Sequence, residues 1–328
     1  MGGPLLSCAF SLFFVGGSVM VRFPDGSLSI ATVEAIADVL QVSPKFLYYL
    51  SNNVGKHYRI TKIPKKNGKF RTIEAPDSYL KHIQRMILDN LLPQSVGEIA
   101  TAFEPGVGLM DNVVQHVGNP VVLALDLKDF FPSLRLHRIV RVLRELDFPR
   151  ASAVLLAKLC TLNGHLPQGA PTSPHLANLA MRTFDDRLSL LCRQENLAVT
   201  RYADDITISG NIDRHCAESL IASCRVMLKE IGLRINYRKL RILRQNARQE
   251  VTGVVVNEKP SVPRHIRREL RKKMYYLRRH GVVGYEPVTL EALRSLLGSV
   301  MFVNYVDPDN FEFRQYAEEL KVRIKECA

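Results

Sequence analysis

The sequence predicts an α+β fold in which a small, largely antiparallel sheet carries helices on one side. Two stretches, at 58–76 and 199–210, alternate apolar and polar residues around turn residues, as β-hairpins do. A third, at 119–127, is a continuous apolar run typical of a strand buried on both faces or nearly so. Helical patterns separate and follow these strands, and this order of elements is typical of an α+β fold.

The first 28 residues form an apolar segment for which several interpretations remain open. Residues 4–21 carry no charge, and the run is about long enough for a marginal membrane span. It also contains two glycines, three serines and a proline, and it lacks the Lys or Arg with which a secretory signal normally starts. A buried N-terminal segment and an artefactual upstream start are equally favoured, and a membrane anchor is less favoured.

The next stretch is expected to hold helices and a long hairpin. Helical spacing within 29–51 predicts two helices, the second of them beginning after Pro44. Asn67-Gly68 lies between the two alternating runs of 58–76 and is a strong hairpin signal. Residues 78–92 then place apolar side chains on one face of an amphipathic helix.

The strand at 119–127 is followed by alternating helices, loops and short strands. The expected elements, in order, are helical structure to about Leu162, a Gly/Pro loop at 163–174, a helix to about Arg193, the 199–210 hairpin, a helix over 213–231, strand candidates within 233–243 and 251–257, and basic helices from Pro263 onward.

The charge balance favours a polyanionic partner. The chain of 328 residues has 45 Lys and Arg against 32 Asp and Glu, a net charge of +13, which favours nucleic acid first and an anionic membrane second. The stretch 264–281 holds eight of these cations against Glu269, with Tyr275 and Tyr276 between them. Such a helix is suited to gripping a duplex backbone. A membrane-surface helix is less favoured because the apolar face is thin.

The cysteines indicate the compartment. The six of them are scattered along the chain without a CxxC pair or a zinc-ligand spacing. They are therefore interpreted as ordinary thiols of a reducing compartment, and a cytoplasmic location is expected. No membrane partner is expected.

Three aspartates are candidates for a metal site. Asp204 and Asp205 lie at the turn of the 199–210 hairpin, and Asp126 lies at the end of the 119–127 strand. Turn chemistry alone accounts for an isolated pair, because Asp tolerates turn backbone. Together, carboxylates on two neighbouring strands supply hard oxygen ligands without softer ones, which suits Mg²⁺ and not zinc. Two such ions can activate a 3′-hydroxyl and stabilise a leaving pyrophosphate.

Two further stretches could meet the phosphates of a nucleotide. "IPKKNGKFR" carries Lys65, Lys66 and Arg71 on a hairpin able to fold over a triphosphate. A solvated basic hairpin, or one that contacts only template phosphates, is the alternative. "LPQGAPTSP" places Gln168 in a loop before a helix, where it could meet nucleotide and template. A plain loop leading into a helix is the alternative for this segment.

With their spacing, "LDLKDFFPSL", "LPQGAPTSP" and "YADD" resemble the palm motifs of reverse transcriptases, and the similarity extends from about residue 45 to the end. Within the bacterial branch, "VTG" at 251–253 and "NVVQH" at 112–116 resemble the two markers of retron reverse transcriptases. The second marker is usually Asn-Ala-x-x-His, so Val113 departs from it.

The resemblance implies a right-hand polymerase fold. The implied parts are an apolar N-terminal segment at 1–28, N-terminal helices and fingers at 29–118, a palm at 119–257 with finger elements interleaved near 140–175, and a basic helical thumb at 258–328.

The resemblance also implies roles for individual residues. Asp126, Asp204 and Asp205 match the metal-binding catalytic triad, with the Leu127 carbonyl as an additional ligand. Lys239 matches a lysine proposed to protonate pyrophosphate as it leaves. The expected nucleotide-binding residues are Lys65, Lys66, Arg71, Asp129, Phe130, Phe131 and Gln168. The expected contacts with RNA or template–primer are Asn112, His116, Tyr202, Val251, Thr252, Gly253, Arg267, Arg271 and Lys272.

Phe131 has a particular implied role in the choice of sugar. It matches the bulky side chain that stacks under the sugar of the nucleotide and excludes a 2′-hydroxyl. The alternative for either Phe is a core aromatic, since Phe130 is adjacent in the sequence.

The implied activity is RNA-directed DNA synthesis from dNTPs with two Mg²⁺ ions, for which Mn²⁺ is able to substitute. Membership of the retron branch implies a structured non-coding RNA as template and primer, a branched RNA–DNA hybrid as product, and a role in phage defence with a separate effector protein. About 75 residues follow Gly253, too few for an added nuclease domain of ordinary size, so a host nuclease is expected to remove the template.

Two alternative functions remain open at this point. The chain could be another bacterial reverse transcriptase, of the group II intron or diversity-generating type; "VTG" and the short C-terminus argue against the intron type. It could also be a non-catalytic RNA-binding protein on a polymerase scaffold. Three clustered carboxylates argue against that, because an idle site has no physical reason to keep them.

Overall fold

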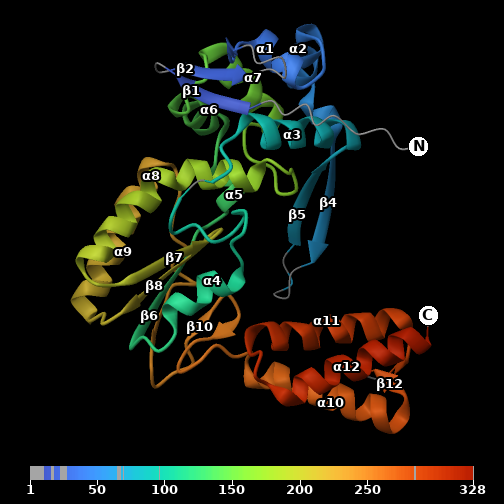
Figure 1. Cartoon of the computed structure of the whole chain (residues 1–328). Helices are drawn as coiled ribbons and strands as arrows, with labels where there is room; N and C mark the ends of the chain where they lie inside the picture. Colours follow the sequence, from blue (N-terminus) through green and yellow to red (C-terminus); the bar gives the residue numbers. More distant parts are fainter. Residues whose placement is uncertain are drawn as a thin grey trace.

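The computed structural model describes residues 11–15, 18–22, 28–64, 68, 70–95, 97–283 and 286–327. A central antiparallel sheet with helices on one side lies between a helical N-terminal part and a C-terminal helical bundle (Figure 1). A long hairpin projects from the N-terminal part toward the bundle (Figure 1). The predicted α+β fold, with a small antiparallel sheet packed on helices, is confirmed.

The described part of the apolar N-terminal segment forms a small antiparallel sheet. Its strands, in the spatial order β1-β2-β3, are β1 (Ser11–Val15), β2 (Ser18–Arg22) and β3 (Leu28–Ile30). Val19 and Val21 are buried in the adjoining core. Among the helices within the described residues, none combines the length and the apolar character needed to cross a bilayer.

Helices surround this sheet, and polar side chains fix where several of them begin. Thr32, Ser43 and Asp77 each accept a backbone hydrogen bond from the first turn of the following helix. The predicted helices within 29–51 and at 78–92 are confirmed. The helical elements of this part are α1 (Val33–Val39), α2 (Pro44–Asn52), η1 (Val54–His57), α3 (Ser78–Leu91), α6 (Leu136–Glu145) and α7 (Arg150–Cys160).

The projecting hairpin is formed by β4 (Tyr58–Pro64) and β5 (Phe70–Pro76), as its alternating pattern predicts. Its base is closed by a hydrogen bond of 2.7 Å between His57 Nδ1 and Asp77 Oδ2. Most side chains of β4 are exposed, so this strand packs little against the rest of the protein. The tip residues 65–67 and 69 lie outside the described residues, and with them the predicted phosphate ligands Lys65 and Lys66.

The central sheet has the spatial order β7-β8-β6-β9, with every pair antiparallel. Its strands are β6 (Val121–Asp126), β7 (Ala198–Tyr202), β8 (Asp205–Gly210) and β9 (Arg241–Arg244). The helices α8 (Ser173–Gln194) and α9 (Arg214–Glu230) cover one face (Figure 1). The strand predicted within 233–243 is limited to β9. Residues before it run as a loop in which the Asn236 N–H donates to the Asp126 carbonyl, 2.7 Å away.

Short elements connect the central sheet to the rest of the chain. The predicted strand at 251–257 is a tight hairpin apart from the sheet, and its turn residues Thr252 and Gly253 have φ of 46° and 86°. The short elements are α4 (Leu109–Val113), η2 (Val114–His116), α5 (Phe130–Ser133), β10 (Glu250–Val251) and β11 (Val254–Val255).

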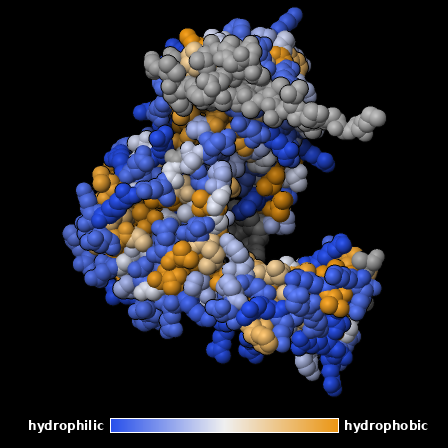
Figure 2. All heavy atoms as spheres, in the orientation of Figure 1, coloured by the Kyte–Doolittle hydropathy of each residue, from blue (hydrophilic) through white to orange (hydrophobic). Residues whose placement is uncertain are grey.

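The basic C-terminal stretch is helical, as predicted. It comprises α10 (Arg264–His280), β12 (Val282–Val283), β13 (Glu286–Pro287), α11 (Leu290–Val306) and α12 (Phe311–Glu326). Leu270, Met274 and Leu277 of α10 are buried in a core shared with α11 and α12. The space-filling view shows the molecule hollowed between this bundle and the part that carries the hairpin (Figure 2).

Candidate active site

The backbone of the central sheet brings the three candidate carboxylates together. Asp126, the last residue of β6, pairs in register with Asp205, the first residue of β8. The Leu127 N–H donates to the Asp204 carbonyl at 2.9 Å. All three aspartates line one cavity of about 360 Å³, together with Arg71, Lys239, Thr252 and other residues. The end of β6 and the turn before β8 therefore hold the three carboxylates around one cavity.

The electrostatics of the cavity reflect this crowding of like charges. Burial, followed by the neighbouring Asp204 and Asp126 carboxylates, raises the pKa of Asp205 to about 6. Burial and the proximity of Asp126 also raise the pKa of Asp204. A cation in the cavity would relieve the repulsion between these groups and favour their charged forms.

Lys239 is the cation of the cavity wall that contacts one of the three carboxylates. Its Nζ lies 2.5 Å from Asp126 Oδ2, and Asn236 Nδ2 donates to Asp126 Oδ1 at 2.9 Å. The hydrogen bond to Asp126 raises the pKa of Lys239, so its ammonium form is stabilised. Lys239 thus lies at the site, as predicted, and Asn236 is a partner of Asp126 that sequence reasoning missed.

The donor set of the cavity suits a hard divalent cation. Its carboxylates supply oxygen ligands without His or Cys, the combination that Mg²⁺ prefers. Within the described residues, no three His, Cys, Asp or Glu side chains are arranged so that they could hold a metal ion. Asp126 Oδ2 is bonded to Lys239 in this structure, so a metal ion held by Asp126 would share or displace that contact.

A buried ion pair between β7 and α8 is another feature that the sequence did not reveal. Arg201 of β7 and Asp185 of α8 are 0% and 2% exposed, and they form a bidentate pair at 2.8 and 2.5 Å. Arg201 Nη1 also donates to the Ala203 carbonyl at 3.1 Å, inside the turn that carries Asp204. Ala203 has φ of +57°, an unfavourable conformation for alanine, so this anchor holds a strained turn in place.

The predicted nucleotide-binding residues lie on three different segments. Arg71 is exposed on β5 and lines the cavity of the three carboxylates. Asp129 is exposed and has a left-handed φ of +46°. Phe130 is buried in the main core, whereas Phe131 is half-buried, with ring centroids 5.3 Å apart. Phe131 is therefore the better placed of the two to meet a ligand.

The loop that carries Gln168 is clamped against the projecting hairpin. The Glu74 N–H of β5 donates to the Gln168 carbonyl at 2.9 Å. At Gly169, where φ is +144°, an added Cβ would lie 2.7 Å from the Glu74 carbonyl oxygen, so only glycine allows this approach. Gln168 itself is half-buried between the hairpin and α8.

Asn112 and His116 were expected to contact RNA, but the structure buries both side chains at 1% and 0% exposure. Asn112 accepts hydrogen bonds from Thr101 and Thr200 at 3.0 and 2.7 Å. It also donates to Thr252 Oγ1 at 3.1 Å. This corrects the expectation, because buried side chains that are satisfied internally cannot reach a nucleic acid.

His116 belongs to the same internal network. Its Nδ1 and Nε2 lie 2.7 and 2.8 Å from the hydroxyls of Ser209 and Thr200. Burial lowers the pKa of His116 to about 4, so the ring is neutral near pH 7. The network joins the "NVVQH" segment to β7, β8 and the "VTG" turn.

We expect Asn112→Ala to disturb the cavity of the three carboxylates indirectly. Thr252 and Gly253 line that cavity, and Asn112 is the side chain that fixes Thr252. The substitution leaves three hydroxyls without this partner and is expected to lower the free energy of unfolding by about 1–3 kcal/mol. At temperatures where the variant is folded, KM for template–primer should rise more than kcat falls. Gln115→Ala, on the same segment and exposed, is the control, and an equal effect of both substitutions would contradict this role.

The remaining predicted RNA contacts differ in accessibility. Tyr202 and Thr252 are half-buried and Gly253 is exposed, whereas Val251 is 2% exposed and therefore contributes only through its backbone. On α10, Lys272 is exposed, but Arg271 forms a bidentate pair with Glu312 of α12.

Arg278 is likewise paired, with Glu319 at 2.6 Å. Part of the positive charge of α10 is thus used inside the C-terminal bundle. Arg267 is half-buried, and its Nε has no hydrogen-bond partner among the described residues.

Comparison with known proteins identifies the family. The sequence profile described as "Reverse transcriptase (RNA-dependent DNA polymerase)" matches residues 63–256, more than half of the chain. The chain belongs to the reverse transcriptase family. By family it is an RNA-directed DNA polymerase, and its fold is the right-hand polymerase fold. Reverse transcriptases generally use divalent metal ions.

The similar curated proteins are retron reverse transcriptases, which confirms the branch. The Retron Mx65 reverse transcriptase of Myxococcus xanthus is 35% identical over 86% of this chain and 70% of its own length. The Retron Ec86 reverse transcriptase of Escherichia coli is 33% identical over 72% of this chain and 75% of its own length. The Retron Mx162 reverse transcriptase of M. xanthus is 32% identical over 87% of this chain, which spans just under two thirds (66%) of that relative.

A solved structure is also similar, at a greater distance. It is that of the foamy viral protease–reverse transcriptase in complex with double-stranded DNA, with 18% identity and a TM-score of 0.49. The match covers 83% of this chain and 40% of the viral one.

Proposed function

We propose that this reverse transcriptase synthesises DNA on an RNA template at the cavity lined by Asp126, Asp204 and Asp205, with Mg²⁺ as its metal. The observation that carries the proposal is the convergence of these carboxylates, from two paired strands, on one cavity that also contains Arg71 and Lys239. The acidic cluster needs cations, and a nucleoside triphosphate with bound metal brings them.

Each residue of the site has a role in this proposal. Asp126, Asp204 and Asp205 would hold the ions, together with the Leu127 carbonyl. When bound, the metal ions would lower the pKa of the 3′-hydroxyl and neutralise charge on the leaving pyrophosphate. Arg71, with Lys65 and Lys66 of the same hairpin, would bind the triphosphate, and Gln168 would orient the nucleotide. Lysine is protonated at neutral pH, and the hydrogen bond to Asp126 raises the pKa of Lys239 further; we propose that Lys239 donates its proton to pyrophosphate as it leaves.

The relatives support a finer proposal about template and product. Because the similar curated proteins are retron reverse transcriptases, we propose that a structured non-coding RNA serves this chain as template and primer. The product would be a branched RNA–DNA hybrid (msDNA). We further propose a role in defence against phage with a separate effector protein, and removal of the template by a host nuclease. Accessible Lys272 and Gly253 would be among the contacts with the RNA.

Primer extension with defined nucleic acids tests the polymerase proposal. The purified chain is freed of metal with EDTA and given a DNA primer on an RNA template with dNTPs. Extension is expected when Mg²⁺ or Mn²⁺ is restored, and none is expected with Ca²⁺ alone or without the RNA template. Absence of extension with every divalent ion would contradict the proposal.

Phe131→Ala is expected to relax the choice of sugar. If the half-buried Phe131 ring excludes the 2′-hydroxyl by contact, its removal relieves an overlap of about 1–3 kcal/mol, or roughly 5–150-fold in discrimination. The measurement is the ratio of kcat/KM for dNTP and rNTP. The matched variant Phe130→Leu, altered in the buried neighbour, should keep the wild-type ratio. An unchanged dNTP/rNTP ratio in Phe131→Ala would mean that another residue excludes the 2′-hydroxyl.

A further inference from the structure

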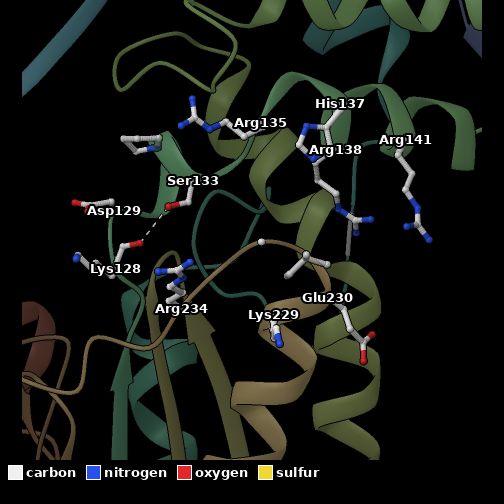
Figure 3. Close-up of a pocket in the computed structure, with 13 residues that line it drawn as sticks. Lys128, Asp129, Ser133, Arg135, His137, Arg138, Arg141, Lys229, Glu230 and Arg234 are labelled. Carbon is white, nitrogen blue, oxygen red and sulfur yellow. Dashed lines mark hydrogen bonds between the residues drawn. The ribbon is translucent and has the colours of Figure 1, made fainter.

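A second cavity, of about 840 Å³, lies beside the catalytic cavity and shares none of its lining residues. It is bounded by the segment that follows β6, by the start of α6, and by the end of α9 with the loop after it (Figure 3). We call it the basic cavity, and it is defined by the side chains of Lys128, Arg135, Arg138, Arg141, Lys229 and Arg234.

The charge of the basic cavity is strongly unbalanced. Asp129 and Glu230 are the acidic residues of its wall, against six Lys and Arg side chains. Glu230 is already paired, with Arg187 at 2.6 Å. Within the part of the chain that the structure describes, no ion pair is formed by Lys128, Arg135, Lys229 or Arg234. The cavity therefore presents uncompensated positive charge to whatever enters it.

Arg138 is a largely buried charge in this wall, and it shares its one ion-pair partner among the described residues, Glu145, with Arg141. It is 7% exposed, and its Nη1 lies 3.7 Å from Glu145 Oε1. Its Nη2 donates to the Ala180 carbonyl at 2.8 Å, and its Nε has no hydrogen-bond partner among the described residues. Because one exposed carboxylate serves two arginines, the charge of Arg138 is only partly compensated, and an anion in the cavity would stabilise it further.

The composition and shape of the wall favour a polyanion over a small organic ligand. Small-molecule sites are lined mostly by apolar side chains, whereas this wall consists mainly of charged ones. Lys128, Arg135 and Arg234 gather on one side of the cavity, and Arg138, Arg141 and Lys229 lie on the other (Figure 3). Cations distributed in this way suit successive phosphates of a nucleic acid strand.

The wall of the basic cavity is also continuous with the segment that carries Asp126 at the end of β6. The Lys128 N–H donates to the Arg234 carbonyl at 2.9 Å, and Leu127 forms an antiparallel bridge with Ile235. Asp126 and Asn236 directly precede and follow these residues on the catalytic side. A strand held in the basic cavity would thus lie close to the site of synthesis, but outside the cavity that contains the carboxylates.

We propose that the basic cavity binds the backbone phosphates of a single-stranded RNA segment, at a place separate from the primer–template. The proposal rests on the proposed function, since it assumes that RNA is the partner. Such a site would anchor a part of the RNA that is not being copied while the template moves past the catalytic carboxylates.

A binding measurement with the catalytic site already filled tests this. The chain is first saturated with an RNA–DNA hybrid, and binding of a fluorescent 12-nucleotide oligouridylate is then followed by anisotropy at several salt concentrations. The test variant is Arg135→Ala/Lys229→Ala/Arg234→Ala. The control, Lys45→Ala/Lys81→Ala/Arg85→Ala, removes the same charge from exposed cations of α2 and α3.

We expect the test variant to bind the oligouridylate at least about tenfold more weakly, and the control to bind like the wild type. The slope of log affinity against log salt should become shallower by about 2, since each phosphate contact on a single strand contributes about 0.7. Extension of the preloaded hybrid should be unchanged in both variants.

Three results would overturn the proposal. The first is equal binding of the oligouridylate by the test variant and the wild type. The second is complete displacement of the oligouridylate by tripolyphosphate, which would mean that the cavity binds free polyphosphate only. The third is loss of hybrid extension in the test variant, which would make the cavity part of the catalytic site. Failure of the wild type to extend the hybrid would instead contradict the proposed function, so the two failures are distinguishable.

Discussion

Asp205→Asn is expected to reduce DNA synthesis by roughly 10³-fold or more while the protein stays folded. The side chain keeps its size, but it loses the charge that would bind metal opposite Asp126. Because burial and two neighbouring carboxylates disfavour this charge, its removal relieves repulsion, and the thermal midpoint should stay equal or rise. The measurements are single-turnover extension of a primer on RNA, and thermal unfolding followed by circular dichroism.

The matched control is Asp186→Asn, an exposed carboxylate on α8, which should change neither quantity. Activity of Asp205→Asn close to that of the wild type would contradict the assignment of the triad. A large fall in the thermal midpoint would mean that Asp205 supports the fold instead of the chemistry.

Arg201→Leu is expected to lower the free energy of unfolding by about 3–5 kcal/mol, because it leaves the buried Asp185 carboxyl without its counter-ion. Burial already raises the pKa of Asp185 in spite of the bidentate pair. Loss of the bond to the Ala203 carbonyl should also release the turn that carries Asp204. Urea unfolding measures the first effect. Extension at a temperature where the variant is folded measures the second, with kcat expected to fall.

The double variant Arg201→Leu/Asp185→Leu separates charge from packing. Replacing both partners by apolar residues removes the unpaired charge, so much of the lost stability should return, while activity stays low because the turn is still unanchored. Arg214→Ala breaks the exposed pair with Glu218 and should leave stability close to that of the wild type. Equal stability of the single and double variants would argue against an unpaired buried charge as the cause.

The strands that carry the three aspartates could be predicted because each is defined by a sequence pattern of adjacent residues. The apolar run before Asp126 and the alternation around Asp204 and Asp205 each define a strand within a few residues. Once both strands belong to one sheet, their ends bring the carboxylates together. The Asn67-Gly68 turn likewise predicts the projecting hairpin from adjacent residues.

The supporting partners could not be predicted because they depend on contacts between distant segments. Asn236 reaches Asp126 across 110 positions, and Asn112 reaches Thr252 across 140. The "NVVQH" segment was expected to face RNA, yet its short helix turns Asn112 and His116 inward, where β7 and β8 supply hydroxyl partners. An arginine within the apolar pattern of β7 was the one signal for the buried pair, since an inward-facing Arg201 requires a carboxylate.

Recovery of the chain's own nucleic acid tests the central claim most directly. The chain is expressed with its flanking DNA and purified, and the bound nucleic acid is extracted and treated separately with RNase and DNase. We predict a discrete species that RNase converts to a shorter DNA and DNase converts to a shorter RNA, which is the behaviour of RNA joined covalently to newly made DNA. RNA alone, or no nucleic acid, would contradict synthesis of a branched product by this reverse transcriptase.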